Sequence, residues 1–173
     1  MDRLTELVRM MIEYEAGVPE RIHHFMKVLA FSRLIGKSEH IDESTLEILE
    51  TAAVLHDVGI KESLRKYETD TGNYQELEGP PIARRMMLKL GYPEEMIRRV
   101  CYLVGHHHTY TDVDGMDYQI LIEADGLVNM MGKGMHTPEI LRMRQSVFRT
   151  KTGIEFLDNM YLKQSDKFES KDL

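Results

Sequence analysis

The sequence has a single cysteine, fewer cationic than acidic residues, no long apolar run and no glycine-rich phosphate loop. Each of these features argues against a particular class of protein. One cysteine excludes an internal disulfide and a zinc site built from cysteines. No apolar run approaches the roughly 18 residues of a membrane-spanning helix. Lysine and arginine total 22 against 29 acidic residues, and a net charge of −7 argues against a nucleic-acid polymer as partner. A small anionic ligand stays compatible, because one locally basic pocket is enough for it.

Length and composition predict one globular domain. A chain of 173 residues, of which 42% are hydrophobic, can bury a substantial core. We expect the domain to span residues 1–162 and the charged residues 163–173 to form a fraying tail. Charged residues interrupt the N-terminal apolar pattern, which is not typical of a signal peptide. We therefore expect a cytoplasmic protein without a membrane partner, and a homodimer stays open.

Hydrophobic periodicity predicts an all-α fold. Apolar residues recur at helical spacing along residues 2–14. Further helices are expected from Pro19 to Ile35, after Asp42 or Ser44, after Pro80 and Pro81, after Pro93, from Leu121 to Val128, after Thr137 and Pro138, and from Ile154 to Leu162. The polar residues 61–73 are expected to form a loop, either a solvated connection or a segment that closes over a substrate. We expect a compact bundle of about six to eight helices.

The run from Thr51 to Ile60 ends an apolar helical pattern in a histidine and a carboxylate. Its other residues are largely apolar, so His56 and Asp57 are expected to be carried into the interior with it. A buried carboxylate is costly unless it is paired, hydrogen-bonded or bound to a metal. Gly59 ends the helix, which places the pair in its last turn, where the two side chains could share one ion. The alternative is a satisfied core histidine with Asp57 capping the turn.

Another histidine and another aspartate follow apolar stripes elsewhere in the chain. His24 shares a helical face with Val28, whereas His23 points about 100° away and competes for the same role. Asp125 lies inside an apolar helix and is hard to explain without a cation.

Three adjacent histidines end the helix that follows Pro93. Its apolar stripe points His107 inward, makes His108 a second candidate and turns His106 outward. The alternative is an exposed polar run at a helix end.

These residues together resemble the HD-domain metal-dependent phosphohydrolase superfamily. That family has a helical histidine with an apolar residue four positions on, then His-Asp, then a distant aspartate often inside Ala-Asp. The matching residues are 21–28, 55–59 and 123–125, and the resemblance covers roughly residues 20–130. It implies an all-α, HD-type helical bundle. It also implies a divalent-metal site formed by His24, His56, Asp57 and Asp125.

Two imidazoles and two carboxylates suit Mn, Fe, Co, Ni or Zn and leave coordination positions open. Dinuclear members of the family carry an additional histidine four residues before a glycine, and here Gln75 stands at that place before Gly79. An amide is a weaker ligand than imidazole for a transition metal, so we expect one ion. A second ion stays possible if Glu76 or Glu78 joins the histidine pair.

The chemistry expected at such a metal site calls for catalytic and substrate-binding residues. Besides Asp57 as a catalytic ligand, Glu78 and His107 are candidates for proton transfer, with Glu76 or a spare histidine as alternatives. His108 is expected to contact the substrate. The family's frequent lysine after His-Asp-x-Gly is replaced here by an isoleucine, and Lys61 follows one position later. We expect Lys61 and Arg65 to neutralise the substrate's charge from the predicted loop.

The expected function is that of a metal-dependent phosphohydrolase acting on a small phosphorylated metabolite or nucleotide. One alternative is a regulatory domain that senses a nucleotide without turnover. Another is a di-iron oxygenase, because a minority of the superfamily resembles such enzymes.

Overall fold

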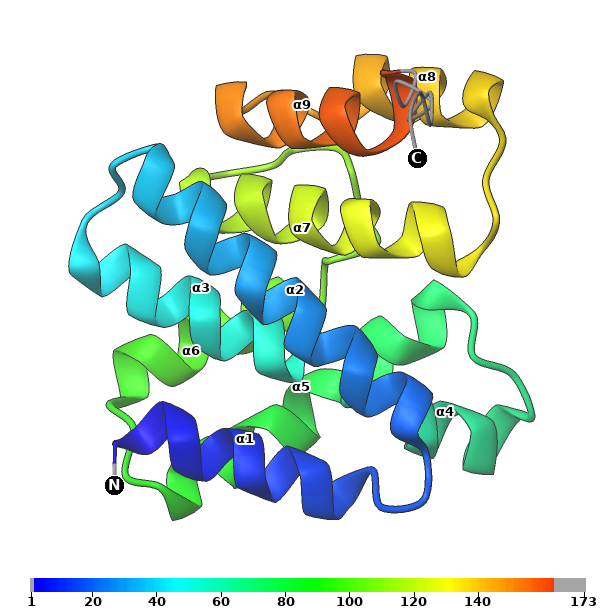
Figure 1. The fold of residues 1–173 in the computed structure, drawn as a ribbon. Coiled ribbons are helices and arrows are strands. Elements are labelled where there is room, and N and C mark those ends of the chain that lie inside the picture. Colours follow the sequence, from blue (N-terminus) through cyan, green and yellow to red (C-terminus); the bar gives the residue numbers. More distant parts are fainter. Residues whose placement is uncertain (1, 164–173) are drawn as a thin grey trace, which may run out of the picture.

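The computed structural model describes residues 2–163, which form helices with no strand among them (Figure 1). The elements are α1 (Arg3–Tyr14), α2 (Pro19–Ser38), α3 (Glu43–Leu55), α4 (Ile60–Tyr67), α5 (Gly72–Lys89), α6 (Glu94–Val104), α7 (Met116–Gly132), α8 (Thr137–Ser146), α9 (Lys151–Leu157) and the π-helical η1 (Asp158–Leu162). The predicted all-α bundle is confirmed. The predicted tail lies, apart from Lys163, outside the described residues. Within residues 2–163, no helix combines the length and apolar composition that crossing a bilayer requires.

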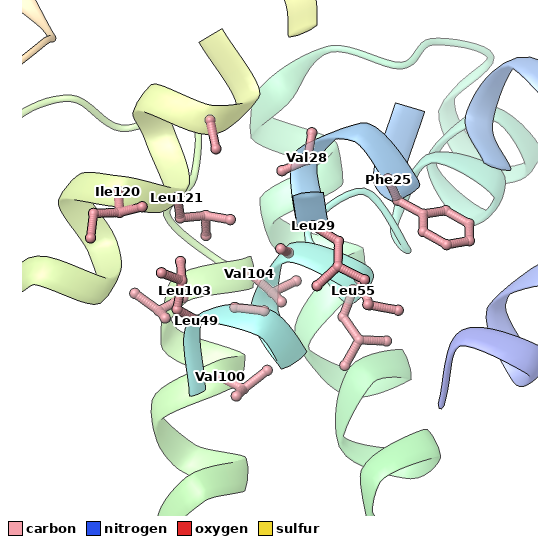
Figure 2. Packing of buried hydrophobic residues seen from close by; sticks show 14 of the residues in the cluster. Phe25, Val28, Leu29, Leu49, Leu55, Val100, Leu103, Val104, Ile120 and Leu121 are labelled. Atoms are coloured by element: carbon pink, nitrogen blue, oxygen red, sulfur yellow. The ribbon is translucent and has the colours of Figure 1, made fainter. Parts of the chain in front are cut away.

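Helix α3 is the buried centre of the fold. It packs against α1, α2, α6 and α7, and its residues 49–55 are all buried. Figure 2 shows Leu49 and Leu55 among side chains of the neighbouring helices, including Val28 and Leu121. Fully burying a leucine side chain stabilises the fold by roughly 1.5–3 kcal/mol. This packing holds the end of α3 in the interior, where His56 is 0% exposed.

Local signals determine where α2 and α3 begin. Asp42, one of the two predicted caps of α3, accepts the backbone N–H of Thr45 at 3.0 Å. Ser44 instead donates its hydroxyl to Asp42 at 2.5 Å, so Asp42 is the cap. Pro19 occupies the first turn of α2, as predicted.

Residues 61–73, predicted as a loop, are largely helical, so that prediction was wrong. Helix α4 runs to residue 67, and α5 already begins at residue 72. Glu62 forms ion pairs one turn along α4 with Arg65 at 2.6 Å and with Lys66 at 3.4 Å. Such pairs each stabilise a helix by a few tenths of a kcal/mol. Polar pairs therefore add to the stability of this helix, in which Ile60, Leu64 and Tyr67 also lie at helical spacing on one face.

Helix α5 begins about two turns earlier than its prolines predict. The sequence places Pro80 and Pro81 in its first turn, but both lie inside the helix. Proline lacks an N–H and crowds the carbonyl four residues before it, so contacts with other elements must support the N-terminal half. Lys66 and Tyr67 of α4 supply two of them, donating to Glu78 at 2.7 Å and 2.9 Å.

The C-terminal elements α8, α9 and η1 lie across the outer side of α7 (Figure 1). The short helix predicted over residues 154–162 corresponds to the end of α9 and η1. Glu123 of α7 is 0% exposed and accepts backbone N–H groups of Arg149 at 2.6 Å and Thr150 at 2.9 Å. The start of α9 is thereby tied to the helix that carries Asp125.

Candidate metal centre

Four side chains from three parts of the bundle converge on one point. His24 comes from the second turn of α2, His56 and Asp57 follow α3, and Asp125 comes from the middle of α7. Nε2 of His24 lies 3.1 Å from Nε2 of His56, 3.1 Å from Oδ1 of Asp125 and 3.3 Å from Oδ2 of Asp57. Nε2 of His56 lies 3.3 Å from Oδ2 of Asp57 and 3.6 Å from Oδ1 of Asp125. We call these residues the four-residue cluster.

The spacing within the four-residue cluster matches the coordination shell of a single ion. Nitrogen and oxygen ligands lie about 2.0–2.2 Å from a transition metal, so neighbouring ligands are about 3.0 Å apart at octahedral angles and about 3.4 Å apart at tetrahedral angles. The measured separations between 3.1 and 3.6 Å fall around these values. One divalent ion would therefore fit among the ligand atoms of His24, His56 and Asp57, which all lie within 4.8 Å of one another, and Asp125 approaches it from the side of the two histidines.

Backbone carbonyls orient two imidazoles for metal binding. Nδ1 of His56 lies 2.8 Å from the carbonyl of Ala53, and Nδ1 of His107 lies 2.9 Å from the carbonyl of Val104. A carbonyl only accepts a hydrogen bond, so each Nδ1 carries a proton and Nε2 is the nitrogen that a metal would bind. Both Nε2 atoms lie within 3.4 Å of Asp57. This is the tautomer that a metal ligand requires.

Two buried polar atoms here have no hydrogen-bond partner. They are Oδ1 of Asp125 and Nε2 of His107. An unsatisfied buried polar group costs roughly 1–3 kcal/mol. A cation in the four-residue cluster would satisfy the Asp125 oxygen directly, so the residues present fit a divalent metal.

The four-residue cluster also perturbs the protonation of its members. Burial acts to lower the pKa of His56, but Asp57 and Asp125 outweigh it and hold that pKa well above its usual value. Burial acts to raise the pKa of both carboxyls, but the neighbouring histidines hold each pKa below its usual value. Without metal, the site therefore keeps its carboxylates ionised and a proton on His56. An entering cation would replace that proton.

A second group of possible ligands adjoins the first. Asp57, His107 and His108 place ligand atoms within 4.8 Å of one another. Oδ1 of Asp57 faces His107, at 3.4 Å, while its Oδ2 faces His24 and His56. Asp57 is thus the one residue shared by both groups.

Gln75 occupies part of this second group. Its amide nitrogen donates to the carbonyl of Asp70, which turns its amide oxygen toward Nε2 of His108, 2.9 Å away. That oxygen can only accept, so Nε2 of His108 carries a proton and offers no lone pair there. Burial, together with the nearby His107, lowers the pKa of His108 to about 4, which keeps the ring neutral. This arrangement weakens the second group as a metal site.

Three residues predicted to act on the substrate lie around α4. Nζ of Lys61 donates to the carbonyl of Tyr14 at 2.8 Å, from a helix and not from the predicted loop. Arg65 pairs with Glu62 on the surface. Glu78 binds Lys66, whose hydrogen bond lowers the pKa of Glu78. Among the described residues, no contact links Arg65 or Glu78 to the four-residue cluster, and an ionised Glu78 is poorly suited to donate a proton.

A buried ion pair that the sequence did not reveal lies near Asp57. Nε of Arg21 is 3.3 Å from Oε2 of Glu15, a carboxylate that is only 2% exposed. Burial raises the pKa of Glu15, and the negative charge of Asp57 acts in the same direction. The positive charges of Arg21 and Lys61 act to lower it. Glu15, Arg21, Lys61 and Asp57 are therefore close enough to influence one another. Nη1 of Arg21 is buried without a hydrogen-bond partner. The sequence offered one indication that Arg21 lies near the metal site, because Arg21 precedes His24 by about one helical turn.

Comparison with known proteins agrees with this geometry. The family model of the HD domain matches residues 21–168. The chain belongs to the HD-domain family. This HD domain is also similar to the crystal structure of a predicted HD superfamily hydrolase from an uncultured Thermotogales bacterium, with a TM-score of 0.65 and 21% sequence identity over 90% of this chain and 83% of that one. At that identity the likeness establishes the fold. The comparison with curated proteins gives no match.

Proposed function

We propose that this HD domain is a metal-dependent phosphohydrolase that acts on a small phosphorylated metabolite or nucleotide. The observation that carries the proposal is the four-residue cluster, in which the side chains of His24 and Asp57 remain 18% and 21% exposed. Four protein ligands with one accessible side leave room for water and for a substrate oxygen. The description of the structural relative as a predicted HD superfamily hydrolase supports hydrolysis as the reaction class.

His24, His56, Asp57 and Asp125 would hold the metal. A divalent ion in such a shell lowers the pKa of a bound water and polarises a phosphoryl oxygen. The mixture of imidazole and carboxylate ligands suits Mn, Fe, Co, Ni or Zn. We infer a single ion, because His108 is bonded to Gln75 and does not offer Nε2 to a second one.

Residues beside the metal ligands would bind the phosphoryl group and move the proton. The free Nε2 of His107 lies 3.4 Å from Asp57, so it can accept a proton from water or return one to the leaving oxygen. Arg21 and Lys61 supply positive charge in a protein of net charge −7. Glu15 holds the Arg21 side chain in place.

Phosphate release from a panel of phosphomonoesters tests the proposal. We expect turnover with added Mn²⁺, Co²⁺ or Zn²⁺, loss of turnover on chelation, and no turnover by Asp57→Ala. Asp112→Asn is the matched control, because Asp112 is exposed and its φ of 55° suits asparagine. Absence of turnover with every compound and every metal, or turnover that resists chelation, would contradict the proposal.

The two alternative functions give different results in related assays. A nucleotide-sensing domain would show ligand-dependent thermal shifts without any product. A di-iron oxygenase would consume oxygen when loaded with iron and would bind two ions about 3.5–4 Å apart. The hydrogen bond between His108 and Gln75 weighs against the second ion that the oxygenase requires.

A further inference from the structure

A largely apolar groove opens directly beside the four-residue cluster. It lies between α2, α7 and η1 and has a volume of about 840 Å³. One wall is a single stripe of α2, formed by Glu20, His23, His24, Lys27 and Phe31. Because His24 belongs both to this wall and to the four-residue cluster, the groove adjoins the candidate metal site on its α2 side.

The opposite wall is almost entirely hydrocarbon and thioether. It is formed by Leu127, Val128, Met131, Met160 and Tyr161. Met131 is 75% exposed and Met160 is 44% exposed, although both are large apolar side chains. Flexible methionines adapt readily to apolar ligands. The hydroxyl of Tyr161 already donates to the carbonyl of Leu127 at 2.5 Å, so it is not free to recognise a polar ligand.

The charged groups of the groove are confined to its α2 wall. Glu20, His23 and Lys27 lie within about one turn of His24, whereas the walls from α7 and η1 carry no charged side chain. A phosphoryl group at the metal would therefore have the Lys27 ammonium and the Glu20 carboxylate near it and an apolar surface beyond it. Pockets of about 300–1,000 Å³ hold ligands of drug-like size, so the groove can take a sizeable organic group.

We propose that the groove binds the alcohol portion of the substrate and that this portion is apolar. The substrate class is then a phosphate monoester of an alkyl or aryl alcohol. This inference rests on the proposed function, which it narrows. Sugar phosphates and nucleotides would bury hydroxyls or base edges against walls that leave them without partners, which costs affinity.

Gly132 provides a way to fill the groove without disturbing the fold. It lines the groove at the end of α7, and a Cβ added there meets no atom within 4 Å. The side chain of Gly132→Phe would therefore enter open space. Gly132→Ala is the matched control. Like Gly132→Phe it replaces glycine by a residue with a higher helix propensity, but its small side chain leaves the groove open.

The experiment uses the full chain with Mn²⁺ and a series of straight-chain alkyl phosphates from ethyl to octyl. Their leaving groups are chemically alike, so the rate differences report binding of the chain. We expect kcat/KM to rise about fourfold with each added methylene until the groove is full. The series should be flat in Gly132→Phe and unchanged in Gly132→Ala. Glycerol phosphate and adenosine monophosphate should be poorer substrates than octyl phosphate.

Uncleavable alkylphosphonates separate this inference from the proposed function. Their affinity for the Mn²⁺-loaded protein should rise with chain length and lose that dependence in Gly132→Phe, whether or not any ester is hydrolysed. If phosphonates show this dependence but no ester turns over, the groove inference stands and the hydrolase proposal fails. If esters turn over without length dependence, or if adenosine monophosphate is preferred, the groove inference is overturned. It is equally overturned if Gly132→Phe changes only the oligomeric state measured by light scattering, which would make the groove a contact between two copies.

Discussion

Binding of a divalent metal should raise the thermal stability of this protein. The residues of the four-residue cluster come from α2, from the end of α3 and from α7, so one ion among them would join segments that separate on unfolding. A ligand that binds only the folded state, at 100 times its Kd, stabilises by about 2.7 kcal/mol. In chains of this size, 1 kcal/mol shifts the Tm by about 2–4 °C. The expected rise in Tm is therefore about 5–11 °C.

Thermal unfolding followed by circular dichroism, before and after metal is added to chelator-treated protein at fixed pH, measures this rise. His56→Gln and Asp125→Asn should each abolish most of it, because each removes one donor from the shell. His106→Gln is the matched control: its Nδ1 lies 2.7 Å from the carbonyl of Tyr102, outside the four-residue cluster.

Three outcomes would refute the reasoning. A rise below about 2 °C at saturating metal would mean that no ion is held by the folded state. A full rise in His56→Gln would show that the ion binds elsewhere. Loss of the rise in His106→Gln would indicate that the run of adjacent histidines, and not the four-residue cluster, binds the metal.

Three further predictions follow from the site. Burial acts to lower the pKa of His56, but the neighbouring carboxylates hold it well above its usual value, so metal binding must displace a proton from this ring. The Kd measured by calorimetry should therefore rise as the pH falls from 8 to 6, and a constant Kd would contradict this. Gln75→His replaces the amide beside His108 by imidazole, so metal analysis should show two ions per chain instead of the one that we propose for the native sequence. An unchanged ratio would contradict the role given to Gln75. Lys61→Ala should raise KM more than it lowers kcat. The reason is that Lys61 contributes positive charge to substrate binding, while its Nζ is held on the carbonyl of Tyr14. An unchanged KM would show that Lys61 is not part of the substrate site.

Helical periodicity, which is a local property of the sequence, was enough to orient the histidines. The stripe containing His24 also contains Val28, which is 0% exposed, whereas His23 is exposed. His107 continues the apolar stripe of α6 and is 0% exposed. His106 lies off that stripe, and its ring is bonded to the carbonyl of Tyr102. The residues that the structure brings together at the candidate metal centre are therefore the ones that the sequence placed on buried faces.

Periodicity failed where tertiary contacts support a helix. Helix α4 has only eight residues, and its three apolar ones, Ile60, Leu64 and Tyr67, are too few to stand out from the polar residues around them. Ion pairs such as Glu62 with Arg65 along the helix and Lys66 with Glu78 across to α5 add to its stability. The second of these pairs cannot be inferred before the relative position of the two helices is known. The same pair keeps Glu78 ionised, which the sequence could not show.

Gln75, on which the proposal of a single ion rests, shows most clearly what the sequence alone could not predict. Gln75 reaches His108 because α5 packs closely on the turn after α3, where a Cβ on Gly59 would clash with the carbonyl of Gln75 and lie 2.8 Å from the backbone nitrogen of Gly79. The close approach of α5 to this turn requires a glycine at position 59. The sequence of α5 does not reveal it, because the prolines of α5 predict that the helix begins later. The backbone contact that brings Gln75 to the histidines therefore also sets the chemistry available beside Asp57. A search for metal ligands by residue type alone would pass over Gln75.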